Sequence, residues 1–156
     1  MTKKVSTALI AALFTLCACN SGVYYSEHLD VDKDGWNMSD EKIFNVDVDD
    51  TLRLFNFYVD LRNTNDYPYC KTFLFVKTTF PDGGMALDTM ECPLANPDGQ
   101  WYGKHSGKYI DNRYFLRKNV IFPQKGRYTF AIAQATRDTN LVGVKDVGIV
   151  IEYSTK

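Results

Sequence analysis

The sequence lacks the features that mark several large classes of protein. Its 156 residues include 18 Lys and Arg against 19 Asp and Glu, so there is no basic excess to meet the phosphates of a nucleic acid. No apolar run reaches the roughly 18 residues that a membrane-spanning helix needs. We therefore expect neither a nucleic-acid partner nor a transmembrane helix.

Residue types that commonly carry catalysis are also scarce. The two histidines are His28 and His105, and the chain contains no G-x-S-x-G, H-E-x-x-H or glycine-rich phosphate motif. Asp88 and Glu91 lie three apart on an expected strand, which points them to opposite faces and suits no paired-carboxylate mechanism. We expect a protein that is not an enzyme.

The N-terminus has the pattern of a lipoprotein signal peptide. Lys3 and Lys4 precede an apolar stretch over residues 5–16, which is long enough for a signal peptide and too short to span a bilayer. Leu16-Cys17-Ala18-Cys19 then matches the bacterial lipobox, in which the last cysteine accepts a diacylglycerol on its thiol. We predict cleavage after residue 18 and a covalent lipid on Cys19, with several acyl chains giving stable anchoring.

The position of the lipobox divides the chain into three parts. Residues 1–18 are the predicted signal peptide, residues 19–27 a lipidated tether and residues 28–156 one domain, which is what this length suits. Asn20 is not the aspartate that retains some lipoproteins in the inner membrane. We therefore expect a lipid anchor in the outer membrane, with the protein facing the periplasm.

The body of the chain has the period of β-strands. From Ile43 onward, apolar residues recur at every second position. Strands are predicted over residues 44–48, 55–62, 114–122, 127–136 and 144–153, with a hairpin over residues 69–92 that turns at Pro81-Asp82-Gly83-Gly84. About seven or eight strands with one apolar face each indicate an all-β fold, an antiparallel β-sandwich of the immunoglobulin or jelly-roll kind.

One acidic segment matches a calcium-loop pattern. Asp30, Asp32, Asp34 and Glu41 occupy the ligand positions of D-x-D-x-D-G-x5-E, with a glycine at residue 35 for the sharp turn. The flanking segments lack the helices of an EF-hand. Two interpretations stay open, a calcium site outside the EF-hand fold and a solvated acidic loop, and we favour the loop. No cofactor is expected apart from the lipid on Cys19.

Two further cysteines lie on the two arms of the predicted hairpin. A bridge between Cys70 and Cys92 would contribute about 3 kcal/mol by closing a loop of this length. A two-residue turn at Asp82-Gly83 puts the two side chains on opposite faces, unless a bulge shifts the register. The disulfide is therefore left open.

Several segments together carry a resemblance to a known family. They include residues 61–64 (LRNT), 66–69 (DYPY), 99–103 (GQWYG) and 141–148 (LVGVKDVG). The chain resembles the gliding-motility lipoproteins of Bacteroidota known as GldH, over about Tyr25 to Tyr153 and at the lipobox. The resemblance implies an outer-membrane lipoprotein needed for gliding, linked to type IX secretion and without enzymatic activity, in which Cys19 alone has a transferable role. The calcium-like loop is not part of the family pattern.

The expected function is therefore that of a non-enzymatic accessory or assembly component of the envelope machinery. Its partners are expected to be the outer-membrane bilayer, through the lipid, and other envelope lipoproteins or components of secretion and motility. Aromatic and arginine side chains favour interfaces, so the candidates are Arg62, Tyr67, Trp101 and Tyr102. The alternative is a lipid-anchored carbohydrate-binding module that uses Trp36 or Trp101 as a sugar platform.

A bacteroidotan source would add one modification. The periplasmic O-glycosylation system of these bacteria modifies Asp-Ser/Thr before an apolar or small residue. Thr51 and Thr89 fit that pattern. Both threonines also suit turns or strands, so glycosylation is predicted as a possibility at each.

Overall fold

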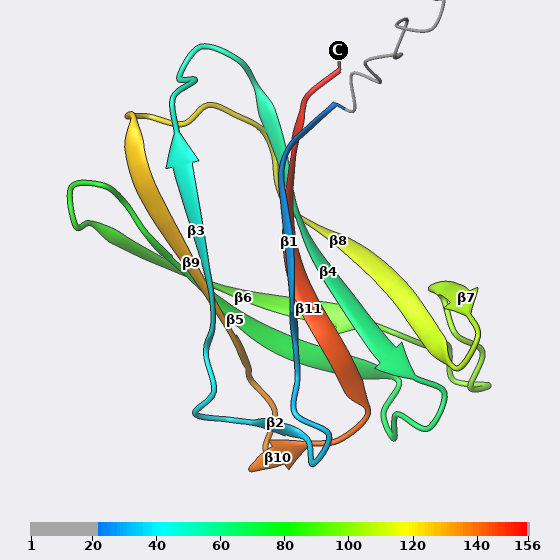
Figure 1. Ribbon diagram of the computed structural model, residues 1–156. Coiled ribbons are helices and arrows are strands. Elements are labelled where there is room, and N and C mark those ends of the chain that lie inside the picture. Colours follow the sequence, from blue (N-terminus) through cyan, green and yellow to red (C-terminus); the bar gives the residue numbers. More distant parts are fainter. Residues whose placement is uncertain (1–21, 156) are drawn as a thin grey trace, which may run out of the picture.

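The computed structural model describes residues 22–155, and every regular element in that range is a β-strand (Figure 1). The strands are β1 (Val23–Asp30), β2 (Trp36–Asn37), β3 (Lys42–Val48), β4 (Phe55–Thr64), β5 (Lys71–Thr79), β6 (Met85–Pro93), β7 (Lys104–Ser106), β8 (Tyr109–Val120), β9 (Gly126–Gln134), β10 (Asn140–Leu141) and β11 (Val144–Tyr153). The described residues include no helix long and apolar enough to cross a membrane.

The strands form two main sheets that pack face to face. One sheet has five strands in the order β1-β11-β4-β8-β7, and the other has four in the order β3-β9-β5-β6. The short strands β10 and β2 pair at one end (Figure 1). All the pairings are antiparallel. The all-β antiparallel sandwich predicted from the sequence is confirmed.

Alternation along the strands builds the core between the two sheets. In β4 every second residue is buried, from Phe55 to Asn63, and the residues between them are half-exposed. β3 buries Phe44, Val46 and Val48 in the same way from the opposite sheet. Side chains two apart on a strand share one face, so each strand gives one side to the core and leaves the other for function.

Aromatic rings close the core at the end where β1 begins. The Tyr24 ring lies 5.0 Å from that of Phe55 and 5.6 Å from that of Tyr153, measured between centroids. Phe55 also contacts Phe122, at 5.1 Å. These tilted and edge-on contacts tie β1, β4, β11 and the β8–β9 loop together.

The folded domain begins earlier than the sequence suggests. Val23–Glu27 belong to β1, which pairs with β11 along its length, so the predicted tether over residues 19–27 is wrong from residue 23 onward. β1 is an edge strand whose residues are all exposed or half-exposed, and it therefore shows no clear apolar alternation. The signal peptide over residues 1–18 and the lipidation site Cys19 lie outside the described residues.

The β5–β6 hairpin has a longer turn than predicted. Its last facing pair is Thr79 and Met85, so five residues form the connection instead of two. The Phe80 amide donates to the Gly84 carbonyl (2.8 Å), and Gly83 takes a positive φ of 87° that suits glycine. This connection shifts the facing residues by one position, because Thr79 faces Met85 where a two-residue turn would make it face Ala86, and it places Thr72 opposite Cys92.

Candidate functional site

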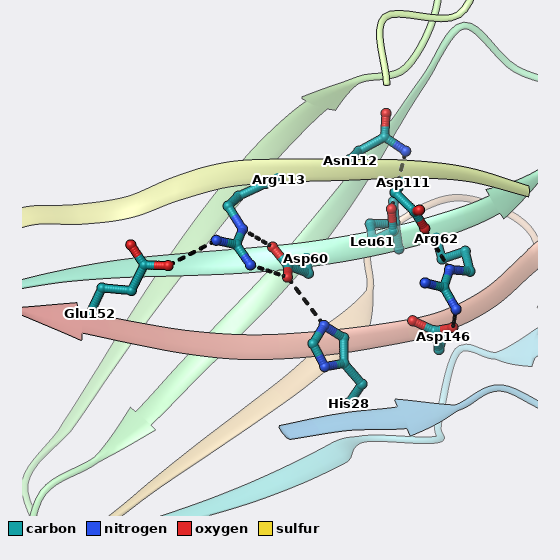
Figure 2. A network of polar contacts seen from close by, with 9 residues as sticks. All are labelled: His28, Asp60, Leu61, Arg62, Asp111, Asn112, Arg113, Asp146 and Glu152. Atoms are coloured by element: carbon teal, nitrogen blue, oxygen red, sulfur yellow. Dashed lines mark hydrogen bonds and ion pairs between the residues drawn. The ribbon is translucent and has the colours of Figure 1, made fainter. Parts of the chain in front are cut away.

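The outer face of the five-stranded sheet carries a group of charged side chains that we call the charged array. Figure 2 shows how they lie across four neighbouring strands. The array consists of His28 from β1, Asp60 and Arg62 from β4, Asp111 and Arg113 from β8, and Asp146 and Glu152 from β11. It borders a shallow depression of about 180 Å³.

One row of the array depends on a glycine in the central strand. Gly148 of β11 faces His28 on one side and Asp60 on the other. A Cβ atom at Gly148 would lie 2.3 Å from His28 Cδ2, so the imidazole occupies the space that a side chain would fill. This lets His28 Nε2 approach Asp60 Oδ2 to 3.1 Å across the intervening strand.

Arg113 holds the same row from the other side. Its Nε and Nη2 donate to the two carboxylate oxygens of Asp60, at 2.7 and 2.8 Å, and its Nη1 donates to Glu152 at 3.0 Å. Such two-point contacts fix the plane of the guanidinium group. The hydrogen bond to Asp60 raises the pKa of Arg113 further above its ordinary value.

A second row is centred on Arg62. Its Nε lies 2.5 Å from Asp111 Oδ1 and its Nη1 lies 3.4 Å from Asp146 Oδ2. The Asp146 side chain is only 10% exposed, and burial raises the pKa of that carboxyl despite the nearby Arg62. Each arginine of the array thus bridges two carboxylates.

Asn112 fixes the two strands under the array. It points to the inner side of the sheet, where its amide donates to Asn63 Oδ1 (2.8 Å) and to the Leu61 carbonyl (3.1 Å). Both asparagines are buried. These buried hydrogen bonds join β4 to β8 on the inner side of the sheet, directly behind the strand positions that carry Arg62 and Arg113.

The array continues into a pair of aromatic rings. Tyr58 lies two residues from Asp60 along β4 and faces Phe115 of β8, with ring centroids 4.5 Å apart. The Arg113 guanidinium lies 5.2 Å from the Tyr58 ring. Phe115 is 48% exposed. We call Tyr58, Asp60, Arg62, Arg113 and Phe115 the docking face.

The depression is lined mainly by charged side chains, and both of its arginines are engaged by carboxylates. Arginine and aromatic side chains, which adjoin on this face, are among the residue types enriched at protein interfaces.

The predicted interface residues do not lie together. Arg62 belongs to the docking face, and Tyr102 is 63% exposed in the segment before β7. Trp101 is half-buried and packs against the core. Tyr67 is only 5% exposed, so its prediction as a surface anchor is wrong: burial of the ring between the sheets raises the pKa of its hydroxyl to about 12.

Trp36 is a core residue. Its side chain is fully buried, and its Nε1 donates to the Asp40 carbonyl at 2.8 Å. Trp36 lies on the short strand β2 and its ring is turned into the core, so neither face of the ring is open to a sugar. Trp36 therefore cannot serve as the predicted sugar platform.

The four calcium-loop residues do not converge. Asp30 ends β1 and contacts Lys145 Nζ at 2.5 Å, whereas Glu41 pairs with Lys77 Nζ at 2.9 Å. Asp32 and Asp34 are exposed in the turn between β1 and β2. Over residues 22–155, no three His, Cys, Asp or Glu side chains are placed to hold a metal ion.

The two hairpin cysteines are not bonded to each other. Cys92 is buried opposite Thr72, and burial raises the pKa of its thiol to about 12. Cys70 is exposed just before β5, and its Sγ points toward the Asn96 carbonyl at 3.7 Å. The register places Thr72, and not Cys70, opposite Cys92, and both thiols are free in this structure.

The two predicted glycosylation sites occupy different settings. Thr89 is exposed on β6, the edge strand of the four-stranded sheet. Thr51 is half-buried in the β3–β4 loop. Glycosylation at each stays a prediction.

Sequence reasoning identified only one member of the charged array, Arg62. His28, Gly148, Asp60 and Arg113 come from four strands, and their juxtaposition depends on the strand order. The available signal was the polar residue at every second position of the predicted strands, which marks an outward face without telling which strands adjoin.

Comparison with known proteins assigns the chain to a family. A family model described as GldH lipoprotein matches residues 23–151. The Gliding motility lipoprotein GldH of Flavobacterium johnsoniae is 31% identical over 156 residues, covering 96% of each chain. The Gliding motility lipoprotein GldH homolog of Christiangramia forsetii is 29% identical over 152 residues, covering 93% of each.

A solved structure is similar at the level of the fold. A carbohydrate-binding module specific for non-crystalline cellulose superposes with a TM-score of 0.43 at 6% identity, covering 84% of this chain and 75% of that one. A likeness of this size bears on neither function nor ligand. The family match, in contrast, runs from the first strand to the last. The chain belongs to the GldH lipoprotein family.

Proposed function

We propose that this protein is an outer-membrane lipoprotein that serves, without catalysis, as an accessory or assembly component of the gliding-motility and type IX secretion-linked envelope machinery. Membership of a lipoprotein family whose relatives are named for gliding motility supports the role in motility. The lipobox ending at Cys19 supports a membrane anchor. The outer membrane, the periplasmic side and the link to secretion are parts of the proposal.

The docking face supports a protein partner. Arg62 and Arg113 are 42% and 46% exposed at the side chain, yet each is held in place by two carboxylates. Holding a long side chain in one geometry before binding reduces the entropy lost on association. Phe115 adds exposed apolar area beside them, and arginine and aromatic side chains are the usual anchors of interfaces. This combination is the observation that favours docking.

A photo-crosslinking experiment in the native organism tests the proposal. Phe115 is replaced by p-benzoylphenylalanine in the full-length, lipidated protein, and crosslinked products are identified by mass spectrometry. The matched control is Phe75, an aromatic residue 42% exposed on β5 of the other sheet. We expect Phe115 to capture an envelope component of gliding or type IX secretion and Phe75 to capture none.

A functional readout accompanies the crosslinking. Arg62→Ala combined with Phe115→Ala should reduce surface spreading and the export of type IX cargo, while Phe75→Ala should not. Equal yields from positions 115 and 75, or normal spreading and export in the double variant at normal protein levels, would contradict the proposal.

The carbohydrate-binding alternative loses support. Trp36, one of its two platform candidates, is fully buried. Trp101, the other, is half-buried with its ring packed against the core. Docking of a protein is therefore the function that we favour.

A further inference from the structure

Three segments meet at one end of the sandwich, which we call the anchor end. They are Gly22, the β3–β4 loop over residues 49–54 and the β8–β9 loop over residues 121–125 (Figure 1). The Tyr153 amide donates to the Gly22 carbonyl at 2.7 Å, and the Ser154 amide donates to the Leu54 carbonyl at 2.8 Å. Phe55 faces Val120, which brings the two loops alongside each other.

The length of chain before this end limits how far it can lie from a membrane. Three residues separate Cys19 from Val23, the first residue of β1. Even a fully extended chain covers only about 3.3–3.6 Å per residue, so the Cα atoms of these two residues lie at most about 14 Å apart. That reach is about twice the headgroup layer of one leaflet, which is roughly 5–8 Å thick. A lipid on Cys19, as in the proposed function, would thus hold the anchor end against the bilayer.

Apolar side chains project from the anchor end. Leu52 is 87% exposed and Ile121 is 50% exposed, and Val23 beside them is 39% exposed. The loop that carries Leu52 is held in shape because Asp50 Oδ1 accepts from the amides of Leu52 (3.0 Å) and Arg53 (3.1 Å). A single exposed apolar side chain is ordinary on a protein surface, but these three lie at the end next to Cys19, where a bilayer would cover them.

Basic and amphipathic groups surround these side chains. Arg53 is 61% exposed at the side chain, and its guanidinium lies 3.9 Å from the Tyr153 ring centroid. Lys125 is exposed in the β8–β9 loop. Arg53 also pairs with Asp50, and Tyr24 donates to Asp49 Oδ1 at 2.9 Å, so carboxylates accompany the cations at this end. Charged groups and tyrosine rings around an apolar tip suit the headgroup region of a bilayer.

We propose that the anchor end rests directly on the phospholipid bilayer, with Leu52 and Ile121 inserted among the headgroups next to the acylated Cys19. The inference depends on the lipid anchor of the proposed function. It fixes the orientation of the domain, with β1 and β11 rising from the membrane and the β2–β10 end farthest from it (Figure 1).

The same surface bears on the predicted glycan at Thr51. That residue directly precedes Leu52, so a sugar on its hydroxyl would hold the loop away from the bilayer. Membrane contact and glycosylation of Thr51 therefore exclude each other. Thr89, on the edge strand β6, is free of this conflict.

Spin labels on the lipidated protein test the contact. Single cysteines replace Leu52 or Ile121 in a Cys70→Ser background, which removes the exposed native thiol, and the protein is reconstituted in phosphatidylethanolamine–phosphatidylglycerol vesicles. The matched controls are Leu87, 67% exposed on β6, and Val142, 51% exposed beside β10 at the opposite end. Labels at 52 and 121 should collide severalfold more with oxygen, and less with a water-soluble nickel complex, than labels at 87 and 142.

The outcomes distinguish a failure of this membrane contact from a failure of the proposed lipid anchor. If the vesicle-bound protein shows labels at 52 and 121 as accessible to the nickel complex as those at 87 and 142, the inference is wrong and the anchor stands. If the labels are shielded from both oxygen and the nickel complex, with or without vesicles, protein covers this end and the inference is again wrong. A protein that fails to sediment with vesicles and carries no acyl mass on Cys19 removes the anchor itself.

Discussion

A side chain of a single hydrogen atom, at Gly148, organises the charged array. The His28 ring lies where a Cβ of residue 148 would project, and this is how a residue of β1 reaches Asp60 two strands away. Gly148→Ala should displace the imidazole and lower the free energy of unfolding by roughly 1 kcal/mol, since the ring loses both its packing and its carboxylate partner. Denaturant unfolding of the unlipidated domain measures the loss.

A double-mutant cycle isolates the cause of that loss. With His28→Ala already present, Gly148→Ala should cost nothing, or stabilise slightly because alanine has less backbone freedom to lose than glycine. An equal loss in both backgrounds would show that strain in β11, and not the imidazole, is responsible.

Asp146 makes stability depend on pH. Burial raises the pKa of its carboxyl in the folded state, so its contribution is favourable below the pKa of the unfolded chain and is lost as pH rises through the folded pKa. Relative to an Asp146→Asn variant, which cannot ionise at this position, the wild-type domain should therefore become more stable as the pH is lowered from 7 to about 4. Denaturant midpoints of both proteins at the two pH values give the comparison.

The opposite trend at Asp146 would have a clear meaning. A wild-type protein that loses ground to Asp146→Asn on acidification would show that attraction to Arg62, 3.4 Å away, outweighs burial. The Asp146 carboxylate would then act mainly by holding the Arg62 guanidinium group in place through their ion pair.

At the scale of elements, β1 is a strand that the sequence pattern did not predict. A chain that starts at residue 28, the predicted domain boundary, would lose the pairing of residues 23–27 with β11 and the Tyr24 contacts to Phe55 and Tyr153. Compared with a chain that starts at residue 22, we expect a loss of roughly 2–3 kcal/mol and a lower Tm. If the chains that start at residues 22 and 28 had the same Tm, residues 23–27 would contribute nothing to the fold and would belong to the tether.

The β5–β6 hairpin makes a prediction about its two thiols. In the folded, unlipidated domain a maleimide should modify Cys70, which is exposed, and leave Cys92, whose burial keeps the thiol protonated. Mass spectrometry should show one adduct in buffer and two in guanidinium, and Cys70→Ser should remove the first. Adducts that form only after addition of a reductant would establish a disulfide.

The elements show where sequence patterns succeed and where they fail. β3, β4, β9 and β11 have one fully buried face, or nearly so, and their alternation predicts them closely. β1 lies at a sheet edge and buries little, while β2, β7 and β10 have three residues or fewer, too short for any period. The predicted register of the β5–β6 hairpin was wrong because the sequence of a turn does not fix whether two or five residues form it.

At the scale of the whole molecule, the anchor is the main determinant of location. Cys19→Ala would remove the thiol that the lipobox predicts to accept the diacylglycerol, so the precursor should stay unacylated and uncleaved by the lipoprotein peptidase. Fractionation should show that the protein leaves the membrane or is held only by its signal segment. A Cys19→Ala protein that still incorporates a palmitate analogue would place the lipid elsewhere.

The charged array also belongs to this scale, because four adjoining strands of the sheet are needed to create it. His28 and Gly148 lie far apart in the sequence, and the pairing of β1 with β11 makes them neighbours. Composition and local pattern indicated the fold class and the outward polar faces. Which outward faces adjoin depends on strand order, and strand order follows from how all the apolar faces are buried at once.

The pairing of the first strand with the last has a mechanical consequence. A pulling force between an anchor at Cys19 and a partner held on the docking face would act along the axis of β1, from its N-terminal end. The seven facing pairs that join β1 to β11 would then bear the load in parallel, in shear, and would not open one after another like a zipper. With a lipid on Cys19, as proposed, such a force would have to break these pairs together before β1 could leave the sheet.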